Sequence, residues 1–285
     1  MFTTDLALAL RAERAGIDSI MVDWETKGKE ARQKGRNLEG NNDTPEDVHS
    51  LSSNLKIPVS VRINPLGGYT LSEVNTALNN GAEIIMLPMA RSVTEVKSFL
   101  SIVGERAKTI VQIETPSLAK EIEDFSNLDW DYAYIGLNDL MVARGGHSIW
   151  EAISDGTAEA ICRYLEGRKY GFGGSTVLGG GEPIMGDLIL HELVRLGGCM
   201  SIMRRTFRRE VLDRDLNCEI RALREFVNCS ERRGLEARLY DHNRLLQAIS
   251  ARRNVYLKLP VPSWEPARTE KNCRQEIRQT AGFVS

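Results

Sequence analysis

Short apolar runs alternate with longer amphipathic segments along the first 206 residues of the chain. The runs are rich in β-branched and aliphatic side chains, and several end abruptly at an acidic residue or a proline. This pattern is typical of strands that are buried on both faces of a parallel sheet. The strands expected from it are residues 1–4, 17–22, 58–64, 82–87, 109–113, 132–135, 170–174 and 199–203.

The segments between these runs carry the signals of helix ends. Thr44-Pro-Glu-Asp47 combines an N-cap residue, a proline at the first helical position and acids in the first turn. Gly81 follows the expected helix 71–80, at the position where glycine commonly ends a helix. Residues 26–43 are polar and lack a hydrophobic period, so we expect a long loop there.

Eight strands that alternate with helices predict an α/β fold built on a parallel sheet. Eight such units in about 200 residues match the (β/α)8 or TIM barrel. A dinucleotide-binding sheet is disfavoured, because no GxGxxG motif follows the first strand. We therefore expect a TIM-barrel catalytic domain at residues 1–206 and a helical extension and tail at residues 207–285.

The expected extension differs from the barrel in charge. The net charge of the 285 residues is -2, but residues 203–285 contain 18 Lys and Arg against 11 Asp and Glu. The preceding residues contain 19 against 28. Although a basic tail is compatible with nucleic-acid binding, we favour docking of the extension on the acidic barrel or on a neighbouring subunit.

The composition is that of an ordinary globular protein, with 42% hydrophobic and 27% charged residues. No apolar run approaches the roughly 18 residues needed to cross a bilayer, so we expect no membrane partner. Residues 1–5 show no secretory signal, and the five cysteines form no CxxC pair. These features predict a cytoplasmic protein with free thiols.

Two acidic residues follow neighbouring expected strands. Glu114 comes directly after residues 109–113, and Asp139 comes shortly after residues 132–135. Because residues 116–127 have helical spacing, the unit is strand–helix–strand, and both carboxylates belong at the same edge of the sheet. Such a pair suits Mg²⁺, which takes few protein ligands and completes its shell with water and substrate oxygens.

Further charged residues belong at the same edge. Asp23 and Glu25 follow the second expected strand, and Arg62 lies near the end of the third. Carboxylates that face one another repel and become protonated unless a cation lies among them. An arginine within an apolar strand is costly unless it is paired. We expect Arg62 either to bond an acid or to face an anionic substrate.

Four motifs in this order resemble the HpcH/HpaI aldolase and citrate lyase β-subunit family of the phosphoenolpyruvate/pyruvate-binding TIM-barrel superfamily. They are Val22-Asp-Trp-Glu25, Val61-Arg-Ile-Asn64, Gln112-Ile-Glu-Thr115 and Ile135-Gly-Leu-Asn-Asp-Leu140. The resemblance spans roughly residues 5–205. It implies a Mg²⁺- or Mn²⁺-dependent barrel that makes or breaks a C–C bond next to a 2-oxo acid or an acyl thioester. It also implies a homo-oligomer, a trimer or hexamer.

The resemblance also implies roles for individual residues. Glu114 and Asp139 would bind the metal, and Arg62 would contact the substrate oxygen that becomes the enolate. Backbone groups at Gly136, Asn138 and Asp139 would bind the substrate carboxylate.

The sequence departs from the aldolases at one position. In the aldolase branch, a histidine at this position serves as the general base or positions it. Here the position is occupied by Thr26. The base could instead be Asp23, Glu25 or a metal-bound water, and the sequence leaves these alternatives open.

The favoured hypothesis is a metal-dependent C–C lyase or aldolase acting through the enolate of a pyruvate- or oxaloacetate-like 2-oxo acid, with an aldehyde as a second substrate. The alternatives are an acyl-CoA lyase of the citryl or malyl type and an inactive barrel that acts as a binding or scaffold subunit. The glycine-rich residues 171–181 follow the seventh expected strand, where barrels often bind phosphate. A turn requirement explains these glycines equally well.

Overall fold

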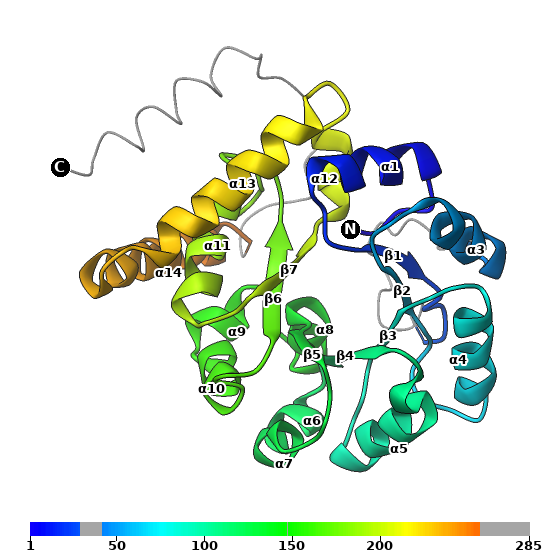
Figure 1. Cartoon of the computed structure of the whole chain (residues 1–285). Coiled ribbons are helices and arrows are strands. Elements are labelled where there is room, and N and C mark those ends of the chain that lie inside the picture. The colour runs from blue at the N-terminus through cyan, green and yellow to red at the C-terminus, as the bar shows by residue number, and fades with distance from the viewer. Residues whose placement is uncertain (29–41, 147, 257–285) are drawn as a thin grey trace.

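The computed structural model describes residues 1–28, 42–146 and 148–256. Within these residues, seven strands form one curled parallel sheet in the order β1 to β7 (Figure 1), and each strand pairs with the next one along the chain. The strands are β1 (Ile20–Asp23), β2 (Val59–Arg62), β3 (Ile84–Leu87), β4 (Lys108–Ile113), β5 (Tyr132–Ile135), β6 (Tyr170–Ser175) and β7 (Met200–Met203).

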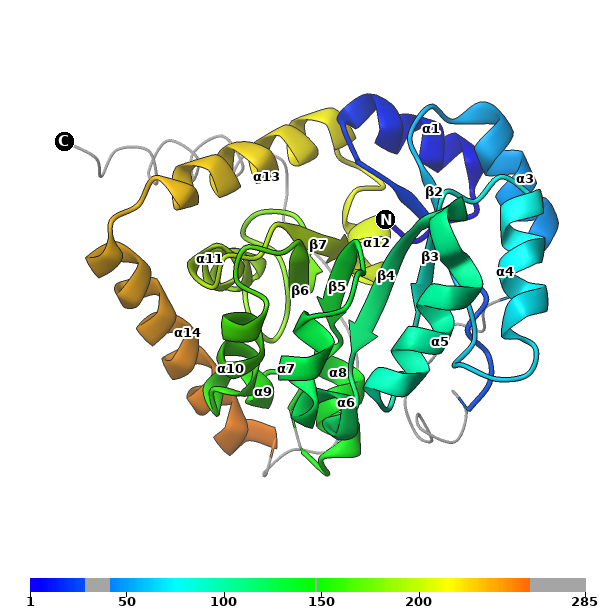
Figure 2. The same cartoon turned by 60° about the horizontal axis from the view of Figure 1, so that its bottom comes forward.

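Helices surround the outer side of the sheet (Figure 2). None of those in the described part of the chain is long and apolar enough to span a bilayer. The helices are α1 (Leu6–Ala15), α3 (Pro45–Asn54), α4 (Thr70–Asn79), α5 (Val93–Val103), α6 (Pro116–Lys120), α7 (Ile122–Ser126), α8 (Leu137–Ala143), α9 (Glu151–Ser154), α10 (Thr157–Tyr164), α11 (Gly186–Arg195), α12 (Arg205–Glu210), α13 (Leu216–Glu231) and α14 (Leu235–Tyr256), with the 3₁₀ helix η1 (Gly104–Arg106) after α5.

Successive strand residues point to opposite sides of the sheet, and this alternation divides the core in two. Val22 and Val61 belong to the large core between sheet and helices. Met21, Met86 and Tyr134 belong to a smaller cluster on the inner side of the curled sheet. At the carboxyl ends of the strands, the side chains on the inner side of the sheet are polar. The candidate site lies at these positions.

The sheet contains one strand fewer than expected. Residues 1–4 form only an isolated parallel bridge between Phe2 and Met21. The segment ends at Asp5, whose carboxylate caps α1 by accepting the N–H of Leu8 at 3.1 Å. Because the helix starts directly after this cap, too few residues remain for a ladder. Among the described residues no ladder joins β7 to β1, so the sheet is a half-barrel that stays open on one side.

Several predicted helix ends are confirmed. Thr44 and Asp47 form a capping box at the start of α3. Gly81 has a left-handed φ of 91° after α4, and its N–H reaches the carbonyl of Leu78. The expected helix 116–127 is divided into α6 and α7 at Glu121, whose carboxylate accepts the N–H of Val93 at 2.6 Å. Helix α8 was not expected.

The helices of the expected extension pack on their own barrel. Helix α13 contacts both α1 and α11, and α14 contacts α11. Leu216 and Leu223 of α13 and Leu245 of α14 belong to the same core as the barrel strands. A domain boundary at residue 206 and packing on a neighbouring subunit stay predictions, and residues 257–285 of the expected tail lie outside the described part.

A buried ionic network fixes α14 to α11. Glu192 is 2% exposed and accepts hydrogen bonds from Arg195 Nε and Nη2, both at 2.8 Å. Its second partner is His242 of α14, whose Nδ1 lies 2.9 Å from Oε2 and 3.1 Å from Oε1 of the same carboxylate. Asp241, the residue before this histidine, pairs with Arg233 at 2.9 Å.

Candidate active site

Side chains from three strands meet at the carboxyl end of the half-barrel. Asp23 ends β1 and is the register partner of Arg62, which ends β2. Gln112 lies in β4, and Glu114 follows it on the same inner side because alternate residues share a face. The structure therefore brings together predicted site residues that are far apart in sequence.

Arg62 is bound by two of the predicted acids. Its Nε donates to Asp23 Oδ1 at 2.9 Å, and its Nη2 donates to Asp23 Oδ2 at 2.7 Å. Its remaining nitrogen, Nη1, lies 3.3 Å from Glu25 Oε2 and 3.5 Å from Gln112 Oε1. The bidentate bond fixes the plane of the guanidinium group and leaves Nη1 with the longer contacts.

The pairing keeps Arg62 charged although it is buried. Burial by itself lowers the pKa of Arg62, but the charge and hydrogen bonds of Asp23, followed by the charges of Glu25 and Glu114, raise that pKa above its ordinary value. Of the two expectations for Arg62, bonding to an acid is the one that the structure shows. The longer contacts of Nη1 are compatible with a second, substrate-facing role.

Glu114 is held by two donors. Its Oε1 accepts the N–H of Met89 at 2.8 Å, and its Oε2 accepts Gln112 Nε2 at 3.2 Å. Met89 adopts a left-handed φ of 54°, which is rare for a residue other than glycine and concentrates at functional sites. Gln112 thus connects Arg62 on one side to Glu114 on the other.

Neighbouring acids perturb the ionisation of Glu114. Burial raises its pKa above the ordinary value, and the charges of Asp139 and Glu25 raise it further, whereas Arg62 and the Met89 N–H lower it. The negative charge of Asp139, which follows the neighbouring strand β5, therefore disfavours the ionised form of Glu114. Such repulsion is relieved when a divalent cation binds between the acids.

The carboxylate pair fits a hard divalent cation. Glu114 and Asp139 carry carboxylate oxygens, and Mg²⁺ is commonly bound through one or two carboxylates with water and substrate completing its shell. Among the described residues no group of three or more His, Cys, Asp or Glu side chains has the arrangement of a metal site. A cage made only of protein ligands is therefore not the kind of site that these residues offer.

Gly136 leaves room for the Glu114 side chain. A Cβ atom at position 136 would lie 2.4 Å from Glu114 Oε2 and 2.6 Å from Glu114 Cβ. The backbone here is fixed, because the Gly136 N–H donates to the carbonyl of Ile113 at 3.0 Å. Glycine at this position is therefore required by the carboxylate that approaches it.

We expect Gly136→Ala to displace the Glu114 carboxylate, to weaken Mg²⁺ or Mn²⁺ binding by about tenfold or more, and to lower the free energy of unfolding by about 1–3 kcal/mol. Calorimetric metal titration and urea unfolding measure the two effects. Gly68→Ala is the control, because a Cβ there meets no atom within 4 Å. Equal metal affinity in both variants would show that the Glu114 position does not matter for the metal.

Asn138 and Asp139 lie in the first turn of α8, directly after β5. Both are half-buried at the rim. The first turn of a helix leaves backbone N–H groups without an intrahelical acceptor, and such groups attract anions. Because α8 starts at the strand end, these groups are placed beside the Glu114 carboxylate.

Asn64 holds the loop that contains Thr26. Its Oδ1 accepts the N–H groups of Thr26 at 3.0 Å and Lys27 at 2.8 Å. Its Nδ2 donates to Glu73 Oε1 of α4 at 2.7 Å. Thr26 is thus fixed through its backbone, and residues 29–41 of the expected long loop lie outside the described residues.

Solved structures of three proteins resemble the fold of this chain. An HpcH/HpaI aldolase from Desulfitobacterium hafniense DCB-2 aligns with a TM-score of 0.54 and 16% identity over 74% of this chain and 88% of that chain. The citrate synthase SbnG aligns with a TM-score of 0.52 and 13% identity over 79% and 92%. A variant of the tryptophan synthase α-subunit from Pyrococcus furiosus gives 0.51 and 13% over 79% and 90%.

The chain has the fold of an HpcH/HpaI aldolase. No family model and no curated protein matches its sequence. Because the tryptophan synthase α-subunit scores almost as high as the aldolase, the likeness establishes the architecture and leaves the chemistry to the residues of the site.

Gln112 and Met89 are the residues with contacts at the site to which the sequence analysis gave no role. Gln112 lies within a quoted motif, and a polar side chain inside an apolar strand is a signal that could have identified it. The N–H of Met89 offers no such signal, since a backbone donor is independent of the side chain that the sequence specifies.

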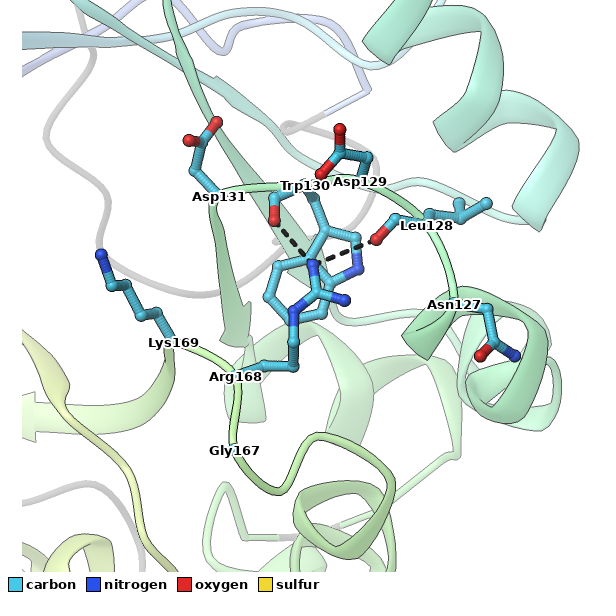
Figure 3. Close-up of a pocket in the computed structure, with 8 residues that line it drawn as sticks. All are labelled: Asn127, Leu128, Asp129, Trp130, Asp131, Gly167, Arg168 and Lys169. Carbon is cyan, nitrogen blue, oxygen red and sulfur yellow. Dashed lines mark hydrogen bonds between the residues drawn. The ribbon is translucent and has the colours of Figure 1, made fainter.

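A surface depression of about 490 Å³ lies at the other end of the barrel, where β5 and β6 begin. Figure 3 shows Arg168 at its centre, with its guanidinium over the Trp130 ring at 3.9 Å from the centroid. Arg168 donates to the carbonyls of Ser126, Leu128 and Trp130. These bonds join the loops that precede the two strands, so the depression is structural and separate from the site.

Proposed function

We propose that the chain is a metal-dependent C–C lyase or aldolase that acts through the enolate of a pyruvate- or oxaloacetate-like 2-oxo acid. One observation carries the proposal: the charged rim in which Asp23 orients Arg62 and Gln112 connects Arg62 to Glu114. A fixed cation beside a carboxylate pair suits a reaction in which negative charge develops on a substrate oxygen.

The proposed metal ligands are Glu114 and Asp139. A bound Mg²⁺ or Mn²⁺ would act as a Lewis acid toward the oxygens of the 2-oxo acid. The remaining steps use the chain's own groups. The backbone N–H groups at Asn138 and Asp139, at the start of α8, are proposed to bind the substrate carboxylate. The N–H of Gly136, which the resemblance also implied, already donates to the carbonyl of Ile113, so Gly136 contributes the space beside Glu114 instead.

Arg62 is proposed to donate through Nη1 to the keto oxygen as that oxygen becomes an enolate oxygen. Asp23 accepts hydrogen bonds from the other two nitrogens of Arg62, Nε and Nη2. The guanidinium group is therefore already in place when negative charge develops on the keto oxygen. The enolate carbon then donates its electron pair to the carbonyl carbon of an aldehyde, and the resulting alkoxide takes up a proton.

Glu25 is proposed as the general base that removes the proton from the methyl group. Asp23 directs both oxygens at Arg62, whereas Glu25 contacts that arginine at 3.3 Å and is close enough to raise the pKa of Glu114. The acyl-CoA lyase and the scaffold subunit, the trimeric or hexameric assembly and the cytoplasmic location stay predictions.

Exchange of the methyl protons of pyruvate with solvent deuterium, followed by NMR, tests the proposal. We expect the wild type to exchange with Mg²⁺ or Mn²⁺, and Glu114→Gln or Asp139→Asn to stop exchange and weaken metal binding by about 10²-fold or more. Glu25→Gln should slow exchange while the metal affinity stays unchanged.

Wild-type protein that binds neither metal and exchanges no protons would contradict the proposal. A parallel panel of acyl-CoA thioesters identifies the thioester lyase, and inactivity on both panels favours the scaffold. Circular dichroism of each variant checks that the loss of a charge at the rim leaves the fold intact.

A further inference from the structure

A second group of polar side chains lies where β6 and β7 end. Four buried side-chain atoms here have no hydrogen-bond partner within the described residues: Trp150 Nε1, Thr176 Oγ1, Arg204 Nη2 and Glu210 Oε2. They come from four segments of the chain, namely the loop before α9, the loop after β6, the residue after β7 and the end of α12. Buried polar groups are normally paired, and a group of unpaired ones is a feature of binding sites.

These residues gather around Arg204, which follows β7. Its backbone N–H donates to the carbonyl of Ser175 at 2.9 Å, and this places Arg204 beside Thr176 at the end of β6. Arg204 lies over Trp150, with its Cζ 5.2 Å from the ring centroid, and its Nε donates to the carbonyl of Gly174 at 2.7 Å. Glu210 lies beside the glycine-rich loop, because a Cβ at Gly180 would lie 3.7 Å from Glu210 Oε2. Burial lowers the pKa of Arg204, and the charge of Glu210 opposes this effect. We call Trp150, Thr176 and Arg204 the Arg204 corner.

Two glycines make room for this arginine. A Cβ at Gly174 would lie 2.5 Å from Arg204 Cγ, and a Cβ at Gly181 would lie 3.1 Å from Arg204 Nη1. The glycine-rich loop noted in the sequence therefore has a specific neighbour. Its small residues allow an arginine to lie between β6 and the loop, which a turn requirement alone does not explain.

The charge of Arg204 is not neutralised by an ion pair among the described residues, in contrast to that of Arg62. Burial raises the pKa of Glu210, whereas the charge of Arg204 lowers it. Tyr134 of the inner cluster lies between the corner and the proposed active site, because it is the register partner of Gln112 in β4 and its own strand β5 pairs with β6 on the other side. The hydroxyl of Tyr134 donates to the carbonyl of Gly173.

We propose that the Arg204 corner binds the oxyanion group, a carboxylate or a phosphate, of the carbonyl substrate that reacts with the enolate. This inference rests on the proposed function and adds the substrate class to it. The corner offers a guanidinium N–H, an indole N–H and a hydroxyl, which are donors suited to oxyanion oxygens. All three groups can donate, whereas a cation such as Mg²⁺ requires acceptor oxygens.

Binding of simple anions is the first test. Wild-type protein, Arg204→Gln, Thr176→Val and Arg91→Gln are titrated by calorimetry with inorganic phosphate and with acetate in metal-free buffer. We expect Arg204→Gln to weaken binding by about tenfold or more and Thr176→Val by a few-fold. Arg91→Gln is the control, because Arg91 is exposed and paired with Glu95, and it should match the wild type.

Absence of anion binding to the wild type, or equal binding by Arg204→Gln, would overturn the proposal. Thr176→Val keeps the test decisive if the arginine variant unfolds, because it removes one hydroxyl at nearly constant volume. Arg62→Lys is titrated beside them, and loss of binding in that variant alone would assign the anion to the proposed enolate site.

Acceptor preference is the second test. Pyruvate is combined with glyoxylate, glyceraldehyde 3-phosphate or neutral glyceraldehyde. We expect Arg204→Gln to lower kcat/KM for one of the anionic acceptors by about 10²-fold and to change the value for glyceraldehyde by less than about threefold. The acceptor whose kcat/KM falls shows whether the corner binds a carboxylate or a phosphate. An equal fall in kcat/KM for all three acceptors would contradict the subsite.

The two tests separate this inference from the proposed function. Anion binding that requires Arg204, in a protein without pyruvate exchange, would support the corner and reject the lyase. Exchange without a preference for anionic acceptors would support the lyase and reject the corner.

Discussion

Arg62→Lys is expected to slow the exchange of pyruvate methyl protons by about 10²–10³-fold while metal binding is retained. Lysine keeps a positive charge near Asp23 and Glu25 but loses the planar fork that meets Asp23 through two nitrogens. The donor to the developing enolate oxygen is then no longer held in place. NMR of pyruvate in D₂O and metal titration measure the two quantities.

A purely structural role for Arg62 would give a different result. The variant would then lose stability through its weakened bond to Asp23 and would exchange at the wild-type rate once folded. Arg168→Lys is the matched control, since Arg168 also donates three hydrogen bonds and lies at the opposite end of the barrel. It should lower stability without changing the exchange rate.

Glu192→Ala is expected to lower the free energy of unfolding by about 3–5 kcal/mol. Removal of this 2% exposed carboxylate leaves Arg195 and His242 without their shared partner between α11 and α14. Arg195 keeps its second partner, Glu159, at 2.7 Å, so the expected cost comes from the hydrogen bonds that the buried Glu192 carboxylate makes to Arg195 and His242. Urea unfolding followed by circular dichroism measures the change.

Glu95→Ala serves as the control for this stability change. Glu95 is half-buried and forms an i,i+4 pair with the exposed Arg91, and such a pair contributes about 0.3–0.5 kcal/mol. Its carboxylate also accepts the N–H of Arg91 at 2.8 Å, which adds about 0.5–1.5 kcal/mol. A loss in Glu192→Ala as small as in Glu95→Ala would mean that α14 is not held by this network. Hydrogen exchange confined to α14 would then report local detachment.

The sequence predicted the architecture well because burial on both faces imposes a readable pattern. The runs at Ile84–Leu87 and Lys108–Ile113 are apolar since helices cover one side of the strand and the inner cluster the other. The first expected strand was wrong as a full strand, because the capping bond of Asp5 competes for the same short segment. Helix α8 was missed, since Gly136 and Asn138 interrupt its hydrophobic period.

Part of the candidate site could be predicted from the sequence, because charged residues within or directly after apolar runs are easy to recognise. Arg62, Glu114 and Asp139 could be named in advance because an ionised group at a strand end is costly without a partner. The hydrogen-bond partners of these residues could not be predicted from the sequence. The donor that fixes Glu114 is the backbone of Met89, and the space that Glu114 occupies depends on three-dimensional proximity to Gly136.

The opening between β7 and β1 gives helix α13 a particular place in the topology. Every ladder of the sheet joins strands that are consecutive in the chain, so each pair closes over a single crossover segment, and this limits the loss of chain entropy. Helix α13, which contacts both α1 and α11, instead links the first helix of the chain to one of the last. Arg224 of α13 pairs with Asp18 at 2.9 Å across 206 positions. The two ends of the open sheet are therefore linked by a helix and not by a strand pair. The contacts of this helix join residues that are far apart in sequence, and they lie on the outside of the molecule.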